Sequence, residues 1–251
     1  MNIAVCVKQV PDTASQLIIS GDNKSIDQSG IKYEINPFDE YALEEALRLK
    51  DRDKTIKITI ISLGPERVKQ SLTKTLAMGA DEAIHIETNE VIDDCINIST
   101  IIANEIKKNQ YDLILFGKKS VDQDNNQVGI MIGEINKISC ISNCSEFKIE
   151  GKKIIANREV EGTVEVFESE LPAIITHEKG RNELRYPSLK DLMAAKKKPI
   201  NTIKVETNID KRSELLKLEY PEKREEGVII GEDKSSVTEL IRILKEEKKI
   251  I

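Results

Sequence analysis

Short apolar segments alternate with amphipathic ones along the first half of the chain. Segments rich in apolar residues and of strand length occur at 3–7, 56–63, 82–86 and 112–116. Short continuous apolar runs are typical of parallel strands that are buried on both faces. Between them, apolar residues at helical spacing predict helices from Asn36 to Leu49, from Arg67 to Met78 and from Asp93 to Lys108. Asn36 and Pro37 are typical of a helix start, and Gly79 of a helix end.

This alternation predicts an α/β fold with a doubly wound, mostly parallel sheet of the flavodoxin-like or Rossmann-like kind, joined by right-handed crossovers. Ligands of such sheets bind beyond the carboxyl ends of the strands, at the point where the strand order reverses. We therefore expect three loops to converge on one crevice: residues 9–12 with the turn at Asn36, residues 62–65, and residues 117–129.

The segment from Gly117 to Gly129 is the most distinctive of these loops. It follows the apolar run 113–116 directly, is dense in Asp, Asn and Gln, and leads into a helix predicted to start at about Asn126. Such a loop presents backbone N–H groups to an anion, and its amide side chains supply paired donors and acceptors. An ordinary polar surface loop is the alternative interpretation.

The second half of the chain has a different pattern. Short strands are expected at 146–149, 152–159, 164–167 and 173–175, as an antiparallel addition at the sheet edge, and a hairpin is expected to pair 17–19 with 30–35. A short helix and a lysine cluster follow within 179–200. The interpretation is a domain over 1–200 and a charged, partner-wrapping extension over 201–251, which carries an amphipathic helix from Ser235 to about Glu247.

Composition narrows the possible functions. Hydrophobic residues make up 39% of the 251 residues and Trp is absent, so the core must consist of Ile, Leu, Val and Ala. A net charge of -6 disfavours nucleic acid as a partner. No apolar run reaches the roughly 18 residues of a membrane span. The four cysteines form no CxxC pair and only two histidines accompany them, so we expect no metal site, reduced thiols and a cytoplasmic protein without membrane insertion.

Several fragments, in order along nearly the whole chain, resemble the beta subunits of electron transfer flavoproteins. The pattern is carried by Val5-Cys-Val-Lys8, Asn36-Pro-Phe-Asp-Glu40, Glu44-Glu-Ala46, Leu76-Ala-Met-Gly-Ala-Asp81, the loop from Gly117 to Gln127, Leu171-Pro-Ala173, Asn182-Glu183, Arg185-Tyr-Pro-Ser-Leu189, Met193 and Ala195-Lys-Lys-Lys-Pro199.

The resemblance implies a heterodimer with an alpha subunit. The two subunits would share a redox-active FAD, and this subunit would bury AMP as a structural nucleotide. The implied contacts are Cys6, Asn36, Pro37, Phe38, Asp39, Leu63, Gly117, Lys118, Lys119, Ser120, Val121, Asp122, Gln123, Asp124, Asn125, Asn126, Gln127 and Val128. On this interpretation Asn36 and Asp39 read ribose or adenine atoms, the N–H groups of 126–128 receive the phosphate, and Cys6 and Leu63 are apolar walls.

The resemblance also implies a docking loop for flavoprotein dehydrogenases, such as the acyl-CoA dehydrogenases of fatty acid β-oxidation. Leu189 corresponds to the leucine that anchors in the dehydrogenase, with steering charge around it. The implied docking residues are Arg185, Tyr186, Leu189, Met193, Lys196, Lys197 and Lys198. A solvated helix end is the alternative interpretation of the three lysines.

Some family members bind a second FAD in this subunit and bifurcate electrons. Their loop typically has a glycine-containing turn and a proline, where this chain has Asp122-Gln-Asp-Asn125 and Ile130. Asn126 and the block around Leu189 follow the ordinary pattern, so AMP is favoured and FAD remains the alternative. A further departure is Leu184, where a proline is usual.

No triad, carboxylate pair or metal cluster is evident, so a subunit without catalytic residues of its own is expected. His85 is expected to be packed in a strand. His177 and Arg158 are expected at the surface, with an approach to the flavin as the alternative. A nucleotide sensor of the universal-stress-protein kind is a competing hypothesis, although it leaves residues 144–251 unexplained. An adenylate-forming ligase would need a Ser-Gly-Gly-type loop that residues 9–12 do not supply.

Overall fold

The computed structural model describes residues 1–89, 92–180, 182–205, 212–223 and 226–251. The chain forms two compact units, Met1–Leu216 and Lys217–Ile251. All the predicted nucleotide and docking residues lie in the first unit. The predicted domain boundary between residues 200 and 201 falls inside a strand of that unit.

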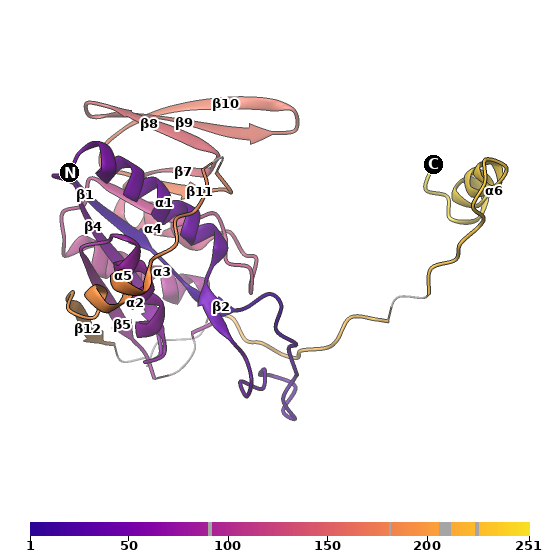
Figure 1. Ribbon diagram of the computed structural model, residues 1–251, viewed down its shortest axis with the longest axis horizontal. Coiled ribbons are helices and arrows are strands. Elements are labelled where there is room, and N and C mark those ends of the chain that lie inside the picture. The colour runs from indigo at the N-terminus through magenta and orange to yellow at the C-terminus, as the bar shows by residue number, and fades with distance from the viewer. Residues whose placement is uncertain (90–91, 181, 206–211, 224–225) are drawn as a thin grey trace. The chain divides into compact units, whose positions relative to one another are not determined.

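The first unit is built on a seven-stranded parallel sheet (Figure 1), which confirms the predicted fold class. Its order is β12-β5-β4-β1-β6-β11-β7. The strands are β1 (Asn2–Cys6), β4 (Lys57–Gly64), β5 (Glu82–Glu87), β6 (Leu113–Gly117), β7 (Ser139–Cys144), β11 (Ala173–His177) and β12 (Ile200–Lys204).

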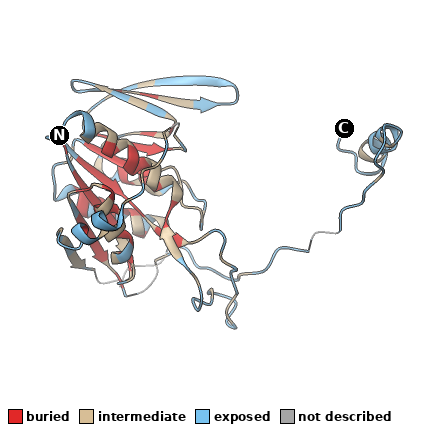
Figure 2. Cartoon of the chain, viewed as in Figure 1, coloured by how far each residue is buried: buried red, intermediate tan, exposed pale blue. Residues whose placement is uncertain are grey.

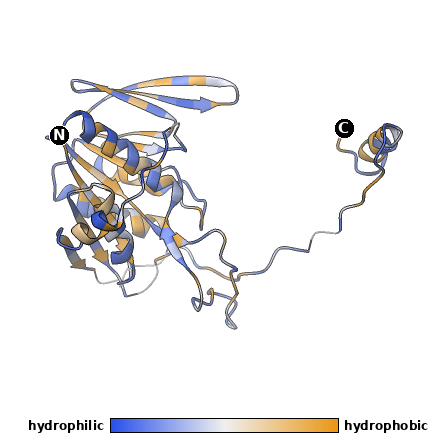
Figure 3. Cartoon of the chain, viewed as in Figure 1, coloured by the Kyte–Doolittle hydropathy of each residue, from blue (hydrophilic) through white to orange (hydrophobic). Residues whose placement is uncertain are grey.

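Helices cover both faces of this sheet, so its inner strands are buried on both sides (Figure 2). Ile3 and Val5 of β1 pack in one core cluster together with helices α1 (Pro37–Arg52) and α2 (Val68–Met78). Ala4 and Cys6 point to the other face, where α3 (Cys95–Lys107) and α4 (Val128–Asn136) supply the apolar residues. The alternation of side chains along a strand explains why β1 must be apolar at every inner position. Figure 3 shows the resulting concentration of apolar residues along the sheet.

The strand order reverses between β1 and β6. The chain adds β4 and β5 on one side of β1, and then crosses through α3 to place β6 on the other side. Ile3 lies opposite Ile58 of β4 and Leu113 of β6 in parallel register. The carboxyl ends of β1 and β6 therefore meet at a topological switch point, the expected place for a ligand.

The segments after α4 correct one part of the sequence interpretation. Strands β8 (Glu146–Glu150), β9 (Lys153–Val160) and β10 (Thr163–Glu170) are antiparallel, but they form a separate sheet. The expected strand at 173–175 is not part of it, because β11 inserts in parallel between β6 and β7. Every residue of β11 is buried, which suits an interior position of the main sheet.

The hairpin predicted to pair 17–19 with 30–35 is wrong. Strand β3 (Tyr33–Ile35) pairs instead with β2 (Gln9–Pro11), and Ile19 forms only an isolated bridge with Ile26. Leu17 and Ile18 are exposed, so this segment has no apolar face to bury in a sheet. The β2–β3 pair brings the chain back to the end of β1, where α1 begins.

The remaining elements are short. Helix α5 (Leu189–Ala195) precedes β12 in the first unit. In the second unit, α6 (Ser236–Arg242) continues into the π-helix η1 (Ile243–Glu247), over the span predicted to be an amphipathic helix. No residue of these two helices is buried within the described part of the chain. Among the described residues, no helix combines the length and the apolar character needed to span a bilayer.

Candidate functional site

Asp39 ties together three elements at the switch point. Its carboxylate accepts the backbone N–H of Lys8, just after β1, at 2.7 Å and the N–H of Gly117, at the end of β6, at 3.0 Å. Asp39 itself lies in the first turn of α1 and is buried. Burial raises the pKa of this carboxyl to about 7, although its hydrogen bonds act in the opposite direction. A Cβ at position 117 would collide with Asp39 and the backbone of Phe38, so the close approach requires glycine.

Asn36 connects the start of α1 to the loop after β6. Its amide nitrogen donates to the carbonyl of Lys119 at 2.9 Å, and its amide oxygen accepts the backbone N–H of Val121 at 3.1 Å. Asn36 is the residue at the N-cap position and Pro37 follows it, as predicted, but its side chain makes no capping bond. The side chain instead fixes the path of residues 119–121, because both of its hydrogen-bonding groups are used on that loop.

Lys8 closes the other side of the loop. Its ammonium nitrogen lies 2.9 Å from Asp122 Oδ1, 3.1 Å from Gln123 Oε1 and 3.4 Å from Ser120 Oγ. The ion pair with Asp122 is partly exposed, and such pairs are weak on their own. Together with Asn36 and Asp39, however, it holds the loop against the end of β1 at several points.

The loop ends in two left-handed residues and an uncapped helix. Asp124 and Asn126 have φ of 57° and 51°, a conformation that Asp and Asn tolerate better than most residues. Helix α4 begins at Val128, close to the start predicted at about Asn126. Gln127 places no side-chain acceptor on the first N–H groups of α4. The side-chain amide of Asn126 donates to Asn143 Oδ1 at 2.9 Å, while its own oxygen is buried with no partner among the described residues.

Cys6 and Leu63, the apolar walls that the resemblance implies, lie near the carboxyl ends of the neighbouring strands β1 and β4. Cys6 is buried at the end of β1, and Leu63 is half-buried near the end of β4. Burial, with a smaller effect from Asp39, raises the pKa of the Cys6 thiol well above its usual value, so it behaves as an apolar side chain. The ammonium groups of Lys118 and Lys119 lie 5.4 and 6.0 Å from the centre of the Phe38 ring.

His177 is not at the surface, contrary to the expectation. It ends β11 and is buried, with Nδ1 2.7 Å from the carbonyl oxygen of Glu178 and Nε2 3.9 Å from Glu45 Oε1. Burial lowers its pKa, so the neutral imidazole is favoured. Arg158 is half-buried, pairs with Glu165 and stacks on Phe167.

The predicted docking residues form a second cluster, around α5. Ser188 and Asp191 make a capping box that starts this helix. Tyr186, Leu189 and Met193 are 77%, 82% and 71% exposed. Leu189 and Met193 are one helical turn apart, so they lie on the same face of α5. Lys196 and Lys197 are exposed directly after the helix.

Two of the predicted docking residues are engaged inside the chain. Arg185 forms ion pairs with Glu44 and Asp51 of α1. The ammonium group of Lys198 donates to the carbonyls of Leu76 and Ala80, at 2.9 and 2.6 Å, at the end of α2. Burial lowers the pKa of Lys198. These two cations therefore position the loop, and the exposed charge belongs to Lys196 and Lys197.

Sequence reasoning missed Lys8, Glu44 and Asn143 as parts of these clusters. Lys8 had a usable signal, because it directly follows a buried parallel strand. The position of Glu44 in the helix pattern gave no signal of such a role, since a glutamate in mid-helix normally faces solvent. Asn143 lies in the unpredicted strand β7.

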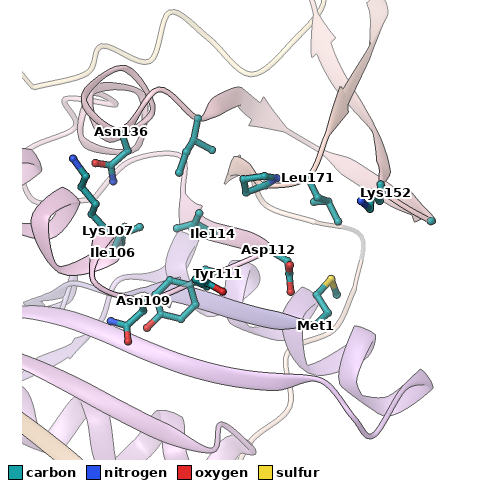
Figure 4. Close-up of a pocket in the computed structure, with 14 residues that line it drawn as sticks. Met1, Ile106, Lys107, Asn109, Tyr111, Asp112, Ile114, Asn136, Lys152 and Leu171 are labelled. Atoms are coloured by element: carbon teal, nitrogen blue, oxygen red, sulfur yellow. The ribbon is translucent and has the colours of Figure 1, made fainter.

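A separate pocket of about 700 Å³ lies at the opposite, amino-terminal ends of β6 and β11 (Figure 4). None of the predicted nucleotide or docking residues lines it. Its lining includes Met1, Ile106, Lys107, Asn109, Tyr111, Asp112, Asn136, Lys152 and Leu171.

Comparison with known proteins gives one consistent result. The family model described as electron transfer flavoprotein domain matches residues 24–208. The electron transfer flavoprotein subunit beta of Bacillus subtilis is 35% identical over 260 residues, covering 100% of both chains. The human protein of that name is 32% identical over 97% of this chain and 98% of its own. The Megasphaera elsdenii protein is 39% identical over 80% of this chain and 77% of its own.

Proposed function

This chain belongs to the beta-subunit family of electron transfer flavoproteins, and we propose that, paired with an alpha subunit, it holds a structural AMP and docks flavoprotein dehydrogenases. Electron transfer is the function of the family. The AMP site, the alpha partner and the docking surface are our proposals for this chain.

The uncapped start of α4 is the observation that carries the AMP proposal. The first turn of a helix has N–H groups that need partners, and it favours negative charge. Here those N–H groups follow a loop that Asn36, Asp39 and Lys8 hold over the switch point. A nucleotide phosphate at this helix start would satisfy them, and the unpartnered oxygen of Asn126 would accept a hydrogen bond from the ligand.

The loop conformation supports a mononucleotide over a second FAD. Positions with positive φ in this loop are occupied by Asp124 and Asn126, and there is no glycine between residues 118 and 128. The loop also turns tightly, since the N–H of Asp124 donates to the carbonyl of Ser120 at 2.9 Å. This is the ordinary family pattern that the sequence resembles, without the glycine-containing turn of the bifurcating members.

The second unit supports the proposed heterodimer. Val228, Ile229, Val237, Leu240 and Ile241 are all exposed within this unit. Exposed apolar residues in such number indicate a surface that is buried against a partner. We propose that residues 217–251 wrap the alpha subunit, which would complete the site of the redox-active FAD.

The redox chemistry of the proposed heterodimer resides in the flavin, and this chain contributes binding and orientation. Tyr186, Leu189 and Met193 form the exposed apolar patch that would contact the dehydrogenase, and Lys196 and Lys197 lie beside it. Anchors of this kind determine residence time, whereas charges around them increase the encounter rate.

Nucleotide analysis of the co-expressed heterodimer tests the proposal. The purified complex is extracted with acid, and the released nucleotides are separated and quantified. One FAD and one AMP per heterodimer are expected. Two FAD without AMP would identify the bifurcating alternative, and a colourless protein with adenine nucleotide alone would identify the nucleotide-sensor alternative.

A further inference from the structure

Helix α1 carries a buried carboxylate that the nucleotide site does not use. The side chain of Glu44 is only 3% exposed, although it lies near the middle of a surface helix. A buried carboxylate is costly unless it is paired and hydrogen-bonded. The partners of Glu44 therefore indicate why it is retained there.

Arg185 is the main partner of Glu44. Its Nε lies 2.9 Å from Glu44 Oε2 and its Nη2 lies 3.0 Å from Oε1, so the guanidinium makes a two-point contact with the carboxylate. The backbone N–H of Arg185 donates to the same Oε2 at 3.3 Å. Arg48, one turn along α1, completes the set with its Nε 3.1 Å from Oε1. A planar two-point pair fixes orientation as well as distance.

The neighbouring residue Glu45 reinforces this attachment. Its Oε1 accepts the side-chain amide of Asn182 at 2.5 Å. Consecutive glutamates of α1 thus hold residues 182 and 185, which are separated by about 140 positions in sequence from the helix. The segment 182–188 has no helix or strand of its own and leads directly into the exposed Leu189. Its course depends on side-chain anchors because no backbone ladder supports it.

We propose that Glu44 is a positioning residue for dehydrogenase docking: it locks Arg185 onto α1 and so presents Tyr186 and Leu189 in a preformed arrangement. This inference rests on the proposed docking function of the loop. A loop that is already ordered loses less conformational entropy on binding, so the lock increases affinity without contacting the dehydrogenase. Glu44 should therefore affect recognition and leave the flavin chemistry unchanged.

The test is the Glu44→Gln variant of the flavin-loaded heterodimer, used as substrate for a flavoprotein dehydrogenase that reduces the wild type. We expect KM for the heterodimer to rise about tenfold, with kcat nearly unchanged. The reason is that the side chains released in the variant must be ordered again when the dehydrogenase binds, which costs conformational entropy. Reduction by dithionite, which does not use the docking loop, should proceed at the wild-type rate, with full flavin content. An unchanged KM would overturn the proposal.

Glu40→Gln is the matched control. Glu40 lies on the same helix and forms an ion pair with Lys74 of α2 at 2.6 Å, a pair that includes no residue of the segment 182–188. The control should leave KM unchanged. If both variants raise KM equally, the effect comes from α1 stability and the proposal fails.

The loop side of the pair gives an independent measurement if Glu44→Gln folds poorly. Arg185→Gln alters a half-exposed residue and should raise KM by a similar factor, whereas Arg185→Lys should do so partly, because lysine lacks the two-point geometry. The double variant should be no worse than either single variant. Additive effects would contradict the pairing. If Leu189→Ala also has no effect, the docking function itself is wrong; if only Leu189→Ala acts, the positioning role alone fails.

Discussion

The carboxylate of Asp39 and the backbone N–H of Gly117 lie 3.0 Å apart, which joins the start of α1 to the end of β6. Because Asp39 also accepts the N–H of Lys8, one buried side chain fixes both strand ends that flank the switch point. The loop of residues 117–129 thus starts from a strand end that is held by a hydrogen bond to Asp39. The carboxyl group of Asp39 is titratable, so its role can be measured through the pH dependence of stability.

Asp39 should make stability fall as the pH rises between about 4 and about 7. In the unfolded chain an aspartate ionises near pH 3.9, whereas burial raises the pKa of Asp39 in the folded protein to about 7. Over this window the folded state holds more protons than the unfolded state. The stabilising contribution of protonated Asp39 is therefore fully present below about pH 4 and is lost by about pH 7. Over this range the free energy of unfolding falls by at most about 1.4 kcal/mol per pH unit.

The Asp39→Asn variant isolates this contribution from all other titrating groups. Urea unfolding of both proteins at several pH values gives the difference in free energy of unfolding between them. We expect the free energy of unfolding of the wild type to fall relative to that of the variant as the pH rises from about 4.5 to about 7. This range lies between the pKa of Asp39 in the unfolded chain and its pKa in the folded protein. A pH-independent difference would show that Asp39 titrates normally.

Asn36→Ser should remove the support of the loop and leave the start of α1 intact. Serine is as good an N-cap residue as asparagine, so α1 should remain stable. It cannot bridge the carbonyl of Lys119 and the N–H of Val121, which the amide of Asn36 does. Loss of these two bonds should weaken AMP binding by about tenfold or more. Titration of AMP into the nucleotide-stripped heterodimer measures this, and circular dichroism checks the helix content. Unchanged affinity would show that the two bonds from Asn36 to the loop do not support AMP binding.

The inner strands of this fold were predictable because they are buried on both faces. That burial makes β1, β4 and β6 apolar at successive positions, which can be read directly from the sequence. The edge strands β7 and β12 are half-exposed and mix polar with apolar residues, so they gave no clear pattern. The place of β11 depends on which strands lie beside it in space, and no local pattern contains that information.

The candidate site, too, was predictable where it follows from the order of the elements, and not where it depends on contacts between distant residues. The rule that ligands bind at carboxyl strand ends brought Asn36 and residues 117–121 together, and the hydrogen bonds of Asn36 join them in the structure. The rule does not say which side chains hold the loop in place. Lys8 and Asp39 do so through tertiary contacts, and Glu44 holds Arg185 across a large sequence separation. Such partners become visible only when the folded chain brings them together.

Leu189→Ala should slow reduction of the heterodimer by a dehydrogenase while flavin content stays at the wild-type level. Leu189 is 82% exposed, so its removal creates no cavity in this chain. If the side chain is buried in a dehydrogenase pocket, truncation should cost about 2 kcal/mol, or roughly thirtyfold in kcat/KM. Stopped-flow flavin reduction gives this ratio. Loss of flavin in parallel would instead place the loop in the flavin site.

Lys197 and Lys198 are adjacent in sequence, but their replacement should affect different properties. Lys198 should affect the stability of the chain, and Lys197 the rate of the dehydrogenase reaction. The ammonium of Lys198 donates to the carbonyls of Leu76 and Ala80, where α2 ends, whereas Lys197 is exposed. Lys198→Met keeps the aliphatic stem and removes the charge, so it should lower the free energy of unfolding by about 1–2 kcal/mol through two lost hydrogen bonds and the lost cation at a helix end. Lys197→Met should leave stability unchanged and slow the dehydrogenase reaction mainly at low ionic strength, because exposed charges act on encounter and are screened by salt. Thermal unfolding and stopped-flow reduction at two salt concentrations distinguish the two roles. The assignment fails if Lys198→Met is as stable as the wild type, or if the effect of Lys197→Met does not depend on salt.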